Sequence, residues 1–331
     1  MPRARLTRMA GTWVPDILGA PFEQLTLELG DDAEGPVVAT LVRSMPPRLA
    51  ALTAPLRDVD VLYVHGWSDY FFQTELARFW NRLGARFYAL DLRKYGRSLR
   101  PGQTPGYVAS LDEYDPDIAA ALAATGTAAH RRRLVLLGHS TGGLTLSLWA
   151  ARHPRVVAAV VLNSPWLELQ TGMIGRQAIA PLIAARARFD PLGAHPVVDL
   201  GFYTRAQRAL GALPESPEGW RPERGFATHP GWLAAITAGH ARVQAGLGID
   251  APVLTLLSAR GTSPLQWADA MTASDSVLVV DDIARAATRL GRRTSIARIT
   301  DAVHDVFLSA PRPREEAYRA LRAWLTTGAL A

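Results

Sequence analysis

Runs of consecutive apolar residues recur along the chain, and between them apolar residues follow the spacing of helices. Six of the runs show no alternation with polar residues, which is typical of strands buried on both faces of a parallel sheet. They are VDVLYVHG (59–66), RFYALDL (86–92), RLVLLGH (133–139), VAAVVLN (157–163), PVLTLLS (252–258) and TSIARIT (294–300).

The segments between these runs predict helices, several of which end at glycine or just before proline, where helices stop. The expected helices cover residues 73–84, 117–126, 144–154, 282–291 and 315–328. Near the start, FEQLTLEL (22–29) and PVVATLVRS (36–44) flank a turn-rich GDDAEG and predict an antiparallel hairpin at the edge of the sheet. The whole pattern predicts an α/β fold with about eight strands, most of them parallel.

The alternation is interrupted once, between Asn163 and Pro252, and no simple crossover connection is that long. This segment is rich in tryptophan, proline and glycine, and it contains helical stretches at 176–189 and 229–248. We therefore expect an α/β core in residues 1–164 and 250–331, with a helical cap inserted at 165–249. The alternative is that these helices pack on the flank of the sheet.

Composition is that of a globular chain, with 48% apolar and 20% charged residues in a length of 331. The net charge of +6 comes from arginine, because Lys94 is the only lysine. The tight basic cluster Arg131–Arg133 precedes a strand, where a solvated strand entry explains it, so we expect no nucleic-acid partner.

Segments that would direct the chain to a membrane or to secretion are not evident. No apolar run approaches the roughly 20 residues that span a bilayer, and the N-terminus lacks the apolar stretch of a secretory signal. These features predict a cytoplasmic protein with no integral membrane segment. The absence of cysteine excludes disulfides and thiol chemistry.

Gly138, Ser140 and Gly142 form a G-x-S-x-G pattern between an apolar strand and a helix. A strand that reverses sharply into a helix strains the backbone of the serine and leaves room only for glycine two positions to either side. Such a turn places the hydroxyl above the carboxyl edge of the sheet, at a helix N-terminus that favours negative charge. The pattern predicts a nucleophilic serine; the alternative is a tight turn whose small residues serve packing.

Several segments together resemble the α/β-hydrolases that carry a cap. They are VLYVHGWSDY, DLRKYGRS and LLGHSTGG, followed by a late acidic loop and by VHD near the C-terminus. The resemblance covers nearly the whole chain and lies with the branch of monoacylglycerol lipases, lysophospholipases and serine-aminopeptidase-like enzymes. It implies a serine hydrolase that cleaves a lipid-like carboxylic ester, a small molecule, through an acyl-enzyme.

A serine hydroxyl needs an imidazole to take its proton and a carboxylate to orient that imidazole. Of the eight histidines, only His304 follows the last strand, in ITDAVHDVFLS, which resembles the catalytic-histidine loop of the family. His65 and His139 belong to the HG and GHS motifs, where we expect them to shape their loops. The others lie beside the arginine cluster, at a helix end or in the expected cap: His130, His153, His195, His229 and His240.

The family places the acid of the triad in the loop after the strand 252–258. In this chain sixteen residues separate Ser258 from Asp275, which is longer than the usual pattern. We favour Asp275, because Asp-Ser-Val resembles the family's acid followed by a strand-like valine, and because one helix fits between it and His304.

Other aspartates near this loop stay open as the acid: Asp269 first, then Asp281, Asp282 and Asp301. Asp281 is better explained as the N-cap of the helix that follows it. Asp301 and Asp305 flank His304, and we interpret them as solvated loop residues.

The oxyanion of an acyl-transfer intermediate needs two preorganised donors. By position these are the main-chain amides of Thr141, just after Ser140, and of Trp67, just after the HG motif. Trp67 also opens an aromatic group with Tyr70, Phe71 and Phe72, which either lines an acyl pocket or begins a helix packed on the sheet.

The predicted chemistry needs no cofactor, and the sequence contains no H-E-x-x-H, P-loop or G-x-G-x-x-G pattern. Two alternatives to an esterase stay open. One is an amidase, aminopeptidase or C–C bond hydrolase with the same triad; an aminopeptidase would need carboxylates in the cap that hold a substrate amine. The candidates are Glu168, Glu215, Glu218 and Glu223. The other is a binding protein on this fold that has lost turnover.

Overall fold

The computed structural model describes residues 11–169, 172–193 and 199–330, and within them nine strands form one sheet. The order across the sheet is β1-β2-β3-β5-β4-β6-β7-β8-β9. The six strands β4 to β9 are parallel to one another. The pairs β1–β2, β2–β3 and β3–β5 are antiparallel. The strands are β1 (Val14–Pro15), β2 (Glu23–Asp32), β3 (Gly35–Ser44), β4 (Val59–Val64), β5 (Arg86–Asp91), β6 (Arg133–His139), β7 (Val157–Asn163), β8 (Val253–Ser258) and β9 (Thr294–Ile299).

The predicted fold class is therefore confirmed, including the edge hairpin, which β2 and β3 form. The strand that the sequence did not predict is β1, which pairs antiparallel with β2 at the edge of the sheet. It is only two residues long, and both residues are exposed, so it carries no hydrophobic period that could be read.

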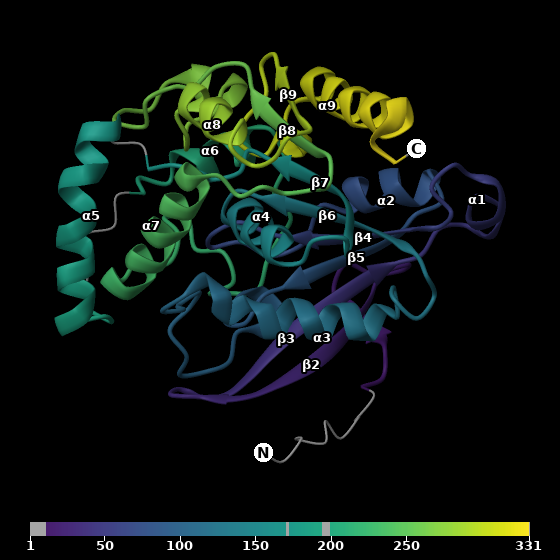
Figure 1. Ribbon diagram of the computed structural model, residues 1–331, viewed down its shortest axis with the longest axis horizontal. Coiled ribbons are helices and arrows are strands. Elements are labelled where there is room, and N and C mark those ends of the chain that lie inside the picture. Colours follow the sequence, from purple (N-terminus) through teal and green to yellow (C-terminus); the bar gives the residue numbers. More distant parts are fainter. Residues whose placement is uncertain (1–10, 170–171, 194–198, 331) are drawn as a thin grey trace.

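Helices cover both faces of the sheet (Figure 1). Because successive residues of a strand point to opposite faces, each buried strand supplies two cores. Leu62 of β4 packs with residues of α3 and α4, whereas the next residue, Tyr63, packs with residues of α2 and α9. These helices are α2 (Thr74–Arg82), α3 (Asp115–Thr125), α4 (Thr141–Arg152) and α9 (Pro311–Trp324). The helices α1 (Arg48–Thr53) and α8 (Val280–Ala287) also lie outside the segment between β7 and β8.

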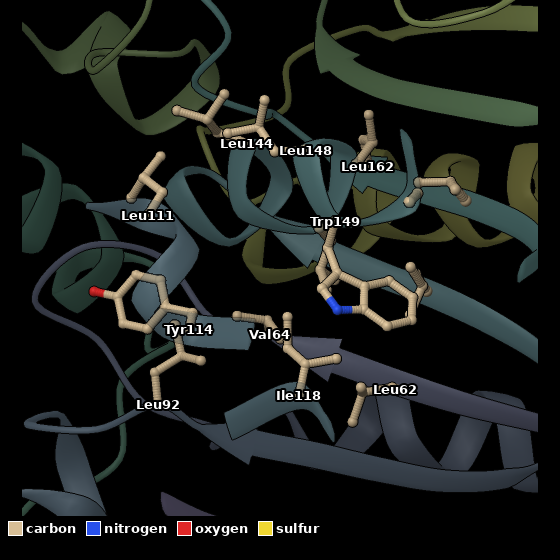
Figure 2. Close-up of a cluster of buried hydrophobic side chains, with 14 of the residues drawn as sticks. Leu62, Val64, Leu92, Leu111, Tyr114, Ile118, Leu144, Leu148, Trp149 and Leu162 are labelled. Atoms are coloured by element: carbon tan, nitrogen blue, oxygen red, sulfur yellow. The ribbon is translucent and has the colours of Figure 1, made fainter. Parts of the chain in front are cut away.

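One of the two cores is seen at close range in Figure 2. Trp149 of α4 and Ile118 of α3 lie beside Leu62 and Val64 of β4, and Leu162 of β7 continues the same layer. This packing holds α4 against the centre of the sheet, which is where the chain leaves β6. The start of α4 is therefore a rigid position.

The segment between β7 and β8 contains α5 (Gly172–Phe189), α6 (Phe202–Ala209) and α7 (Pro230–Ala245). Helix α5 packs on α7, α7 packs on α4, and α6 contacts the short helix Asp269–Ala273. Figure 1 shows α5 and α7 side by side at one end of the molecule. Helix α6 was not expected from the sequence, because its eight residues show no long apolar period.

Two arginines of the cluster 131–133 make ion pairs, so the cluster is not simply a solvated strand entry. Arg132 pairs with Asp60 at 2.6 Å, and Arg133 pairs with Asp58 at 2.7 Å, both at the start of β4. None of the helices in the described ranges is long and apolar enough to cross a bilayer.

Candidate active site

Ser140 lies at the turn from β6 into α4, with φ 51° and ψ −117°. This conformation is strained for any residue with a side chain. A Cβ on Gly138 would come within 2.6 Å of the Cα of Gly143, and one on Gly142 would overlap the carbonyl oxygens of His65 and Val64. The two glycines of the motif are therefore required by close main-chain contacts.

His304 and Asp275 form a buried pair. The Nδ1 atom of His304 lies 2.9 Å from Oδ2 of Asp275, and the two residues are 2% and 0% exposed. The other carboxylate oxygen, Oδ1, accepts hydrogen bonds from the amides of Val277 and Leu278 at 2.7 and 2.8 Å. These amides orient the carboxylate, so that Oδ2 points at the imidazole.

Two other candidate acids lie at the surface. Asp269 is exposed and accepts a hydrogen bond from the indole of Trp267 at 3.2 Å. Asp301 is exposed and pairs with Arg260 at 3.1 Å. Neither carboxylate contacts the imidazole of His304.

The interpretation of Asp281 as a helix N-cap is wrong. Helix α8 begins at Val280, and its N-cap is Val279, which makes no side-chain cap. The helix starts earlier because Val280 is needed in its buried face. Asp281 lies in the first turn and pairs with Arg298 at 2.6 Å, while Asp282 pairs with Arg285 at 2.7 Å.

The interpretation of Asp305 as a solvated residue is also wrong. Its carboxylate is buried and accepts hydrogen bonds from Asn163 Nδ2 at 2.6 Å, Gln73 Nε2 at 3.2 Å and the amide of Phe307 at 3.0 Å. The loop after β9 turns into the interior after Asp301 and is buried from Ala302 onward, so the side chain of Asp305 is buried as well. Three donors make the burial of this charge tolerable.

The loop after β4, residues 65–69, lies against the serine. A Cβ on Gly66 would be 3.1 Å from the Cβ of Ser140, and Ser68 has a positive φ of 53°. Within the described ranges, the main-chain amides of Trp67 and Thr141 donate to no other group. Neither amide is therefore occupied by another group of the described chain.

A pocket of about 100 Å³ joins these elements. Ser140, His304 and Trp67 line it from the core, and Tyr203 and Arg221 line it from the segment between β7 and β8. The sequence offered no signal for these last two residues, because they belong to no motif and lie far from Ser140 along the chain.

The aromatic group after the HG motif divides between its two expected roles. Trp67 lines the pocket and lies against Trp232, with ring centroids 3.7 Å apart and an angle of 35° between the rings. Tyr70, Phe71 and Phe72 are buried just before α2 and belong to the core.

The two histidines of the motifs are buried. Burial lowers the pKa of His65 and that of His139. His65 Nδ1 lies 2.7 Å from the carbonyl oxygen of Gly66, and its Nε2 accepts a hydrogen bond from the amide of Leu92 at 3.2 Å. The proton of His65 is therefore on Nδ1, and the imidazole braces the loop against β5.

The remaining histidines do not line this pocket in the part of the chain that the structure describes: His130, His153, His229 and His240. His195 lies outside the described residues. Over the same ranges, no group of three or more histidine, aspartate or glutamate side chains is placed to hold a metal ion.

Comparisons with known proteins agree with this architecture. Residues 57–259 match the model of the family described as serine aminopeptidase, S33. Lysophospholipase L2 of Escherichia coli K12 is 28% identical over 239 residues, which are 66% of this chain and 68% of that protein.

Solved structures show the same fold. The monoacylglycerol lipase of Paleococcus ferrophilus superposes with a TM-score of 0.62 at 23% identity, over 86% of this chain and 98% of that one. A soluble variant of the monoglyceride lipase of Saccharomyces cerevisiae gives a TM-score of 0.62 at 16% identity, over 91% and 95%.

Proposed function

The chain belongs to the serine aminopeptidase (S33) family of α/β-hydrolases, and from that membership we propose that it is a serine hydrolase that cleaves a carboxylic ester through an acyl-enzyme. The observation that carries this proposal is one pocket in which Ser140, at its strained turn, is joined by His304, whose Nδ1 lies 2.9 Å from a fully buried carboxylate of Asp275.

Each residue of the triad has a role that follows from its hydrogen bonds. Because Asp275 accepts the Nδ1 proton of His304, the lone pair of Nε2 is free to take the proton of the Ser140 hydroxyl. The serine oxygen then attacks the ester carbonyl, and the imidazolium returns the proton to the leaving alcohol. Water repeats the two steps on the acyl-enzyme and releases the acid.

The oxyanion of each tetrahedral intermediate would bind to the main-chain amides of Trp67 and Thr141. Their freedom from other partners among the described residues supports this role. Donors of this type contribute about a hundred- to a thousandfold each to the rate.

The substrate would be a lipid-like ester of the monoacylglycerol or lysophospholipid type. The names of the relatives, a lysophospholipase and two monoacylglycerol lipases, support this class. Residues 165–249 would act as a helical cap between two parts of the core, 1–164 and 250–331. Tyr203 and Arg221 of this segment line the pocket beside Ser140, which supports that role.

A second candidate is an aminopeptidase, which the description of the family favours. Such an enzyme needs a carboxylate that binds the substrate amine. Among the described residues, the pocket is lined by Asp69, which pairs with Arg221, and by Asp199. The glutamates considered for this role, Glu168, Glu215, Glu218 and Glu223, do not line it.

A fluorophosphonate probe and a substrate panel test the proposal. We expect the probe to label wild-type protein but not Ser140→Ala, and Ser140→Ala and His304→Ala to lose at least about ten-thousandfold in kcat on p-nitrophenyl esters. The panel compares esters from acetate to palmitate, monooleoylglycerol and lysophosphatidylcholine with amino-acid p-nitroanilides. Faster turnover of the anilides would favour the aminopeptidase, and a wild type that neither labels nor turns over would refute a serine hydrolase.

A further inference from the structure

A continuous series of hydrogen bonds connects the loop of His304 with the loop of Trp67, and three side chains of the segment between β7 and β8 carry it. We call these side chains, Tyr203, Gln207 and Arg221, the bridge. The bridge begins at Asp305, immediately after His304, and ends at Asp69, two residues after Trp67.

At the first end, Tyr203 contacts the histidine loop twice. Its ring meets the imidazole of His304 edge-on, with centroids 5.3 Å apart and an angle of 85° between the rings. Its hydroxyl accepts a hydrogen bond from the amide of Asp305 at 3.1 Å. The ring therefore restricts the imidazole, and the hydroxyl restricts the backbone that carries it.

In the middle, Gln207 lies one helical turn after Tyr203 on α6 and is 1% exposed. Its Nε2 donates to the hydroxyl of Tyr203 at 2.8 Å, and its Oε1 accepts a hydrogen bond from Nη2 of Arg221. Both ends of the amide are thus occupied, so its orientation is determined by its two neighbours.

At the other end, Nε of Arg221 donates to Oδ1 of Asp69 at 3.1 Å, and both side chains are almost buried. Burial raises the pKa of Asp69, and the charge of Arg221 opposes that effect. Between Asp69 and Trp67 lies Ser68, which has a positive φ of 53°.

The same two loops also meet within the core. Gln73 follows the Trp67 loop, and its Nε2 donates to the carboxylate of Asp305 at 3.2 Å. The bridge and this contact together form a closed ring of contacts between the two loops, one part supplied by the core and the other by the inserted segment.

We infer that the bridge residues are positioning residues, which fix the base, His304, relative to the oxyanion donor, the amide of Trp67. This inference rests on the proposed function. Catalytic groups must be held to within a fraction of an ångström, and a displacement of 1 Å can cost about a hundredfold in rate. The two loops follow β4 and β9, which three strands separate in the sheet, and the bridge adds a second connection between them beside the hydrogen bond from Gln73 to Asp305.

A double-mutant cycle tests the continuity of the bridge. Tyr203→Phe keeps the ring on His304 but removes the hydroxyl, and Gln207→Leu removes both bonds of the amide. We expect each to lower kcat about tenfold with KM changed less than about threefold, because positioning acts on the transition state. The double variant should be no slower than the slower of the two single variants, because both substitutions interrupt the same connection between the two loops.

Gln244→Leu is the matched control. Gln244 lies on α7 of the same segment and donates to Glu168 at 2.8 Å, away from the pocket. We expect kcat close to wild type for this variant, and a loss in Tyr203→Phe/Gln244→Leu equal to that of Tyr203→Phe alone. If the losses of Tyr203→Phe and Gln207→Leu multiply in their double variant, the two residues act separately and the inference is overturned.

Hydrogen–deuterium exchange tests whether the bridge holds the two loops without a measurement of enzyme activity. In Gln207→Leu we expect faster amide exchange in both loops, residues 66–70 and 303–307, and in Gln244→Leu in neither. Unchanged exchange in either loop of Gln207→Leu would overturn the inference. If wild-type protein fails to react with a fluorophosphonate, the proposed function fails, whereas the exchange result still shows whether the bridge holds the two loops.

Discussion

Ser140 and His304 line one pocket, but different forces hold the two sides of that pocket in place. On the serine side, main chain packs against main chain: a Cβ at Gly142 would overlap two carbonyl oxygens, and no side-chain hydrogen bond caps the start of α4. On the histidine side, Asp275, Asp305 and Tyr203 hold the loop through hydrogen bonds and ring contacts.

The comparison teaches where each side tolerates change. Main-chain packing has no flexible group that can move aside, so an added atom on the serine side must displace a strand or a helix. A single hydrogen bond contributes about 1 kcal/mol, so the histidine side can lose support in steps. We expect substitutions on the serine side to lower the free energy of unfolding, and substitutions on the histidine side to lower the rate of ester hydrolysis.

The largest effect should come from Asp275→Asn. The amide of an asparagine can donate to Nδ1 of His304, which leaves the proton on Nε2 and removes the base. We expect kcat/KM on a p-nitrophenyl ester to fall by about ten-thousandfold, with little change in the melting temperature. Asp269→Asn is the control, because its carboxylate is exposed, and it should be close to wild type. A large loss in Asp269→Asn with a small one in Asp275→Asn would exchange their roles.

The next effect should be that of Gly142→Ala on stability. The added methyl group meets the main chain of β4 and of His65, so we expect a loss of about 3 kcal/mol in the free energy of unfolding by urea. Gly239→Ala is the matched control. Its Cβ would come within 2.9 Å of a Leu111 methyl group, which can move, and alanine is favoured in a helix. Equal losses in the two variants would contradict the distinction between main-chain and side-chain packing.

A smaller effect on stability should distinguish the backbone strain at Ser140 from the role of its hydroxyl in catalysis. Glycine adopts a positive φ without strain, so Ser140→Gly should be about 1 kcal/mol more stable than Ser140→Ala, which keeps a Cβ at φ 51°. Both variants should lack esterase activity. Thermal unfolding of the two proteins gives the difference, and equal melting temperatures would indicate that the turn relaxes in the absence of the hydroxyl.

The smallest effect should be a pH dependence of stability from His65. Its pKa is lowered in the folded protein, so below pH 6.5 the unfolded chain binds a proton that the folded protein does not. Stability therefore falls as the pH drops, by at most about 0.8 kcal/mol at pH 6 for one such group. Urea unfolding between pH 8 and 5.5 should show a shallower slope for His65→Gln than for wild type. A steeper or unchanged slope would mean that another group causes the dependence.

Much of the fold could be predicted because local pattern determines it. Five of the six parallel strands, β4 to β8, are continuous apolar runs because both of their faces are buried. The expectation of two buried faces is wrong for β9, which lies at the edge of the sheet and is largely exposed. The interpretations of Asp281 as a helix N-cap and of Asp305 as a solvated residue were both wrong, and for the same reason. The sequence around each residue is compatible with a cap or a solvated loop, and only the packing of Val280 and the inward turn after β9 decide otherwise.

The sequence by itself determined the elbow, because its requirements are met within five residues: glycine at 138 and 142, with serine between them at the end of a buried strand. The tertiary structure decided the partners. Asp275 and His304 are 29 residues apart in the chain, and Arg221 and Asp69 are 152 apart. Spacing along a chain determines contacts only within one element, whereas contacts between loops depend on how the sheet and the inserted helices bring them together.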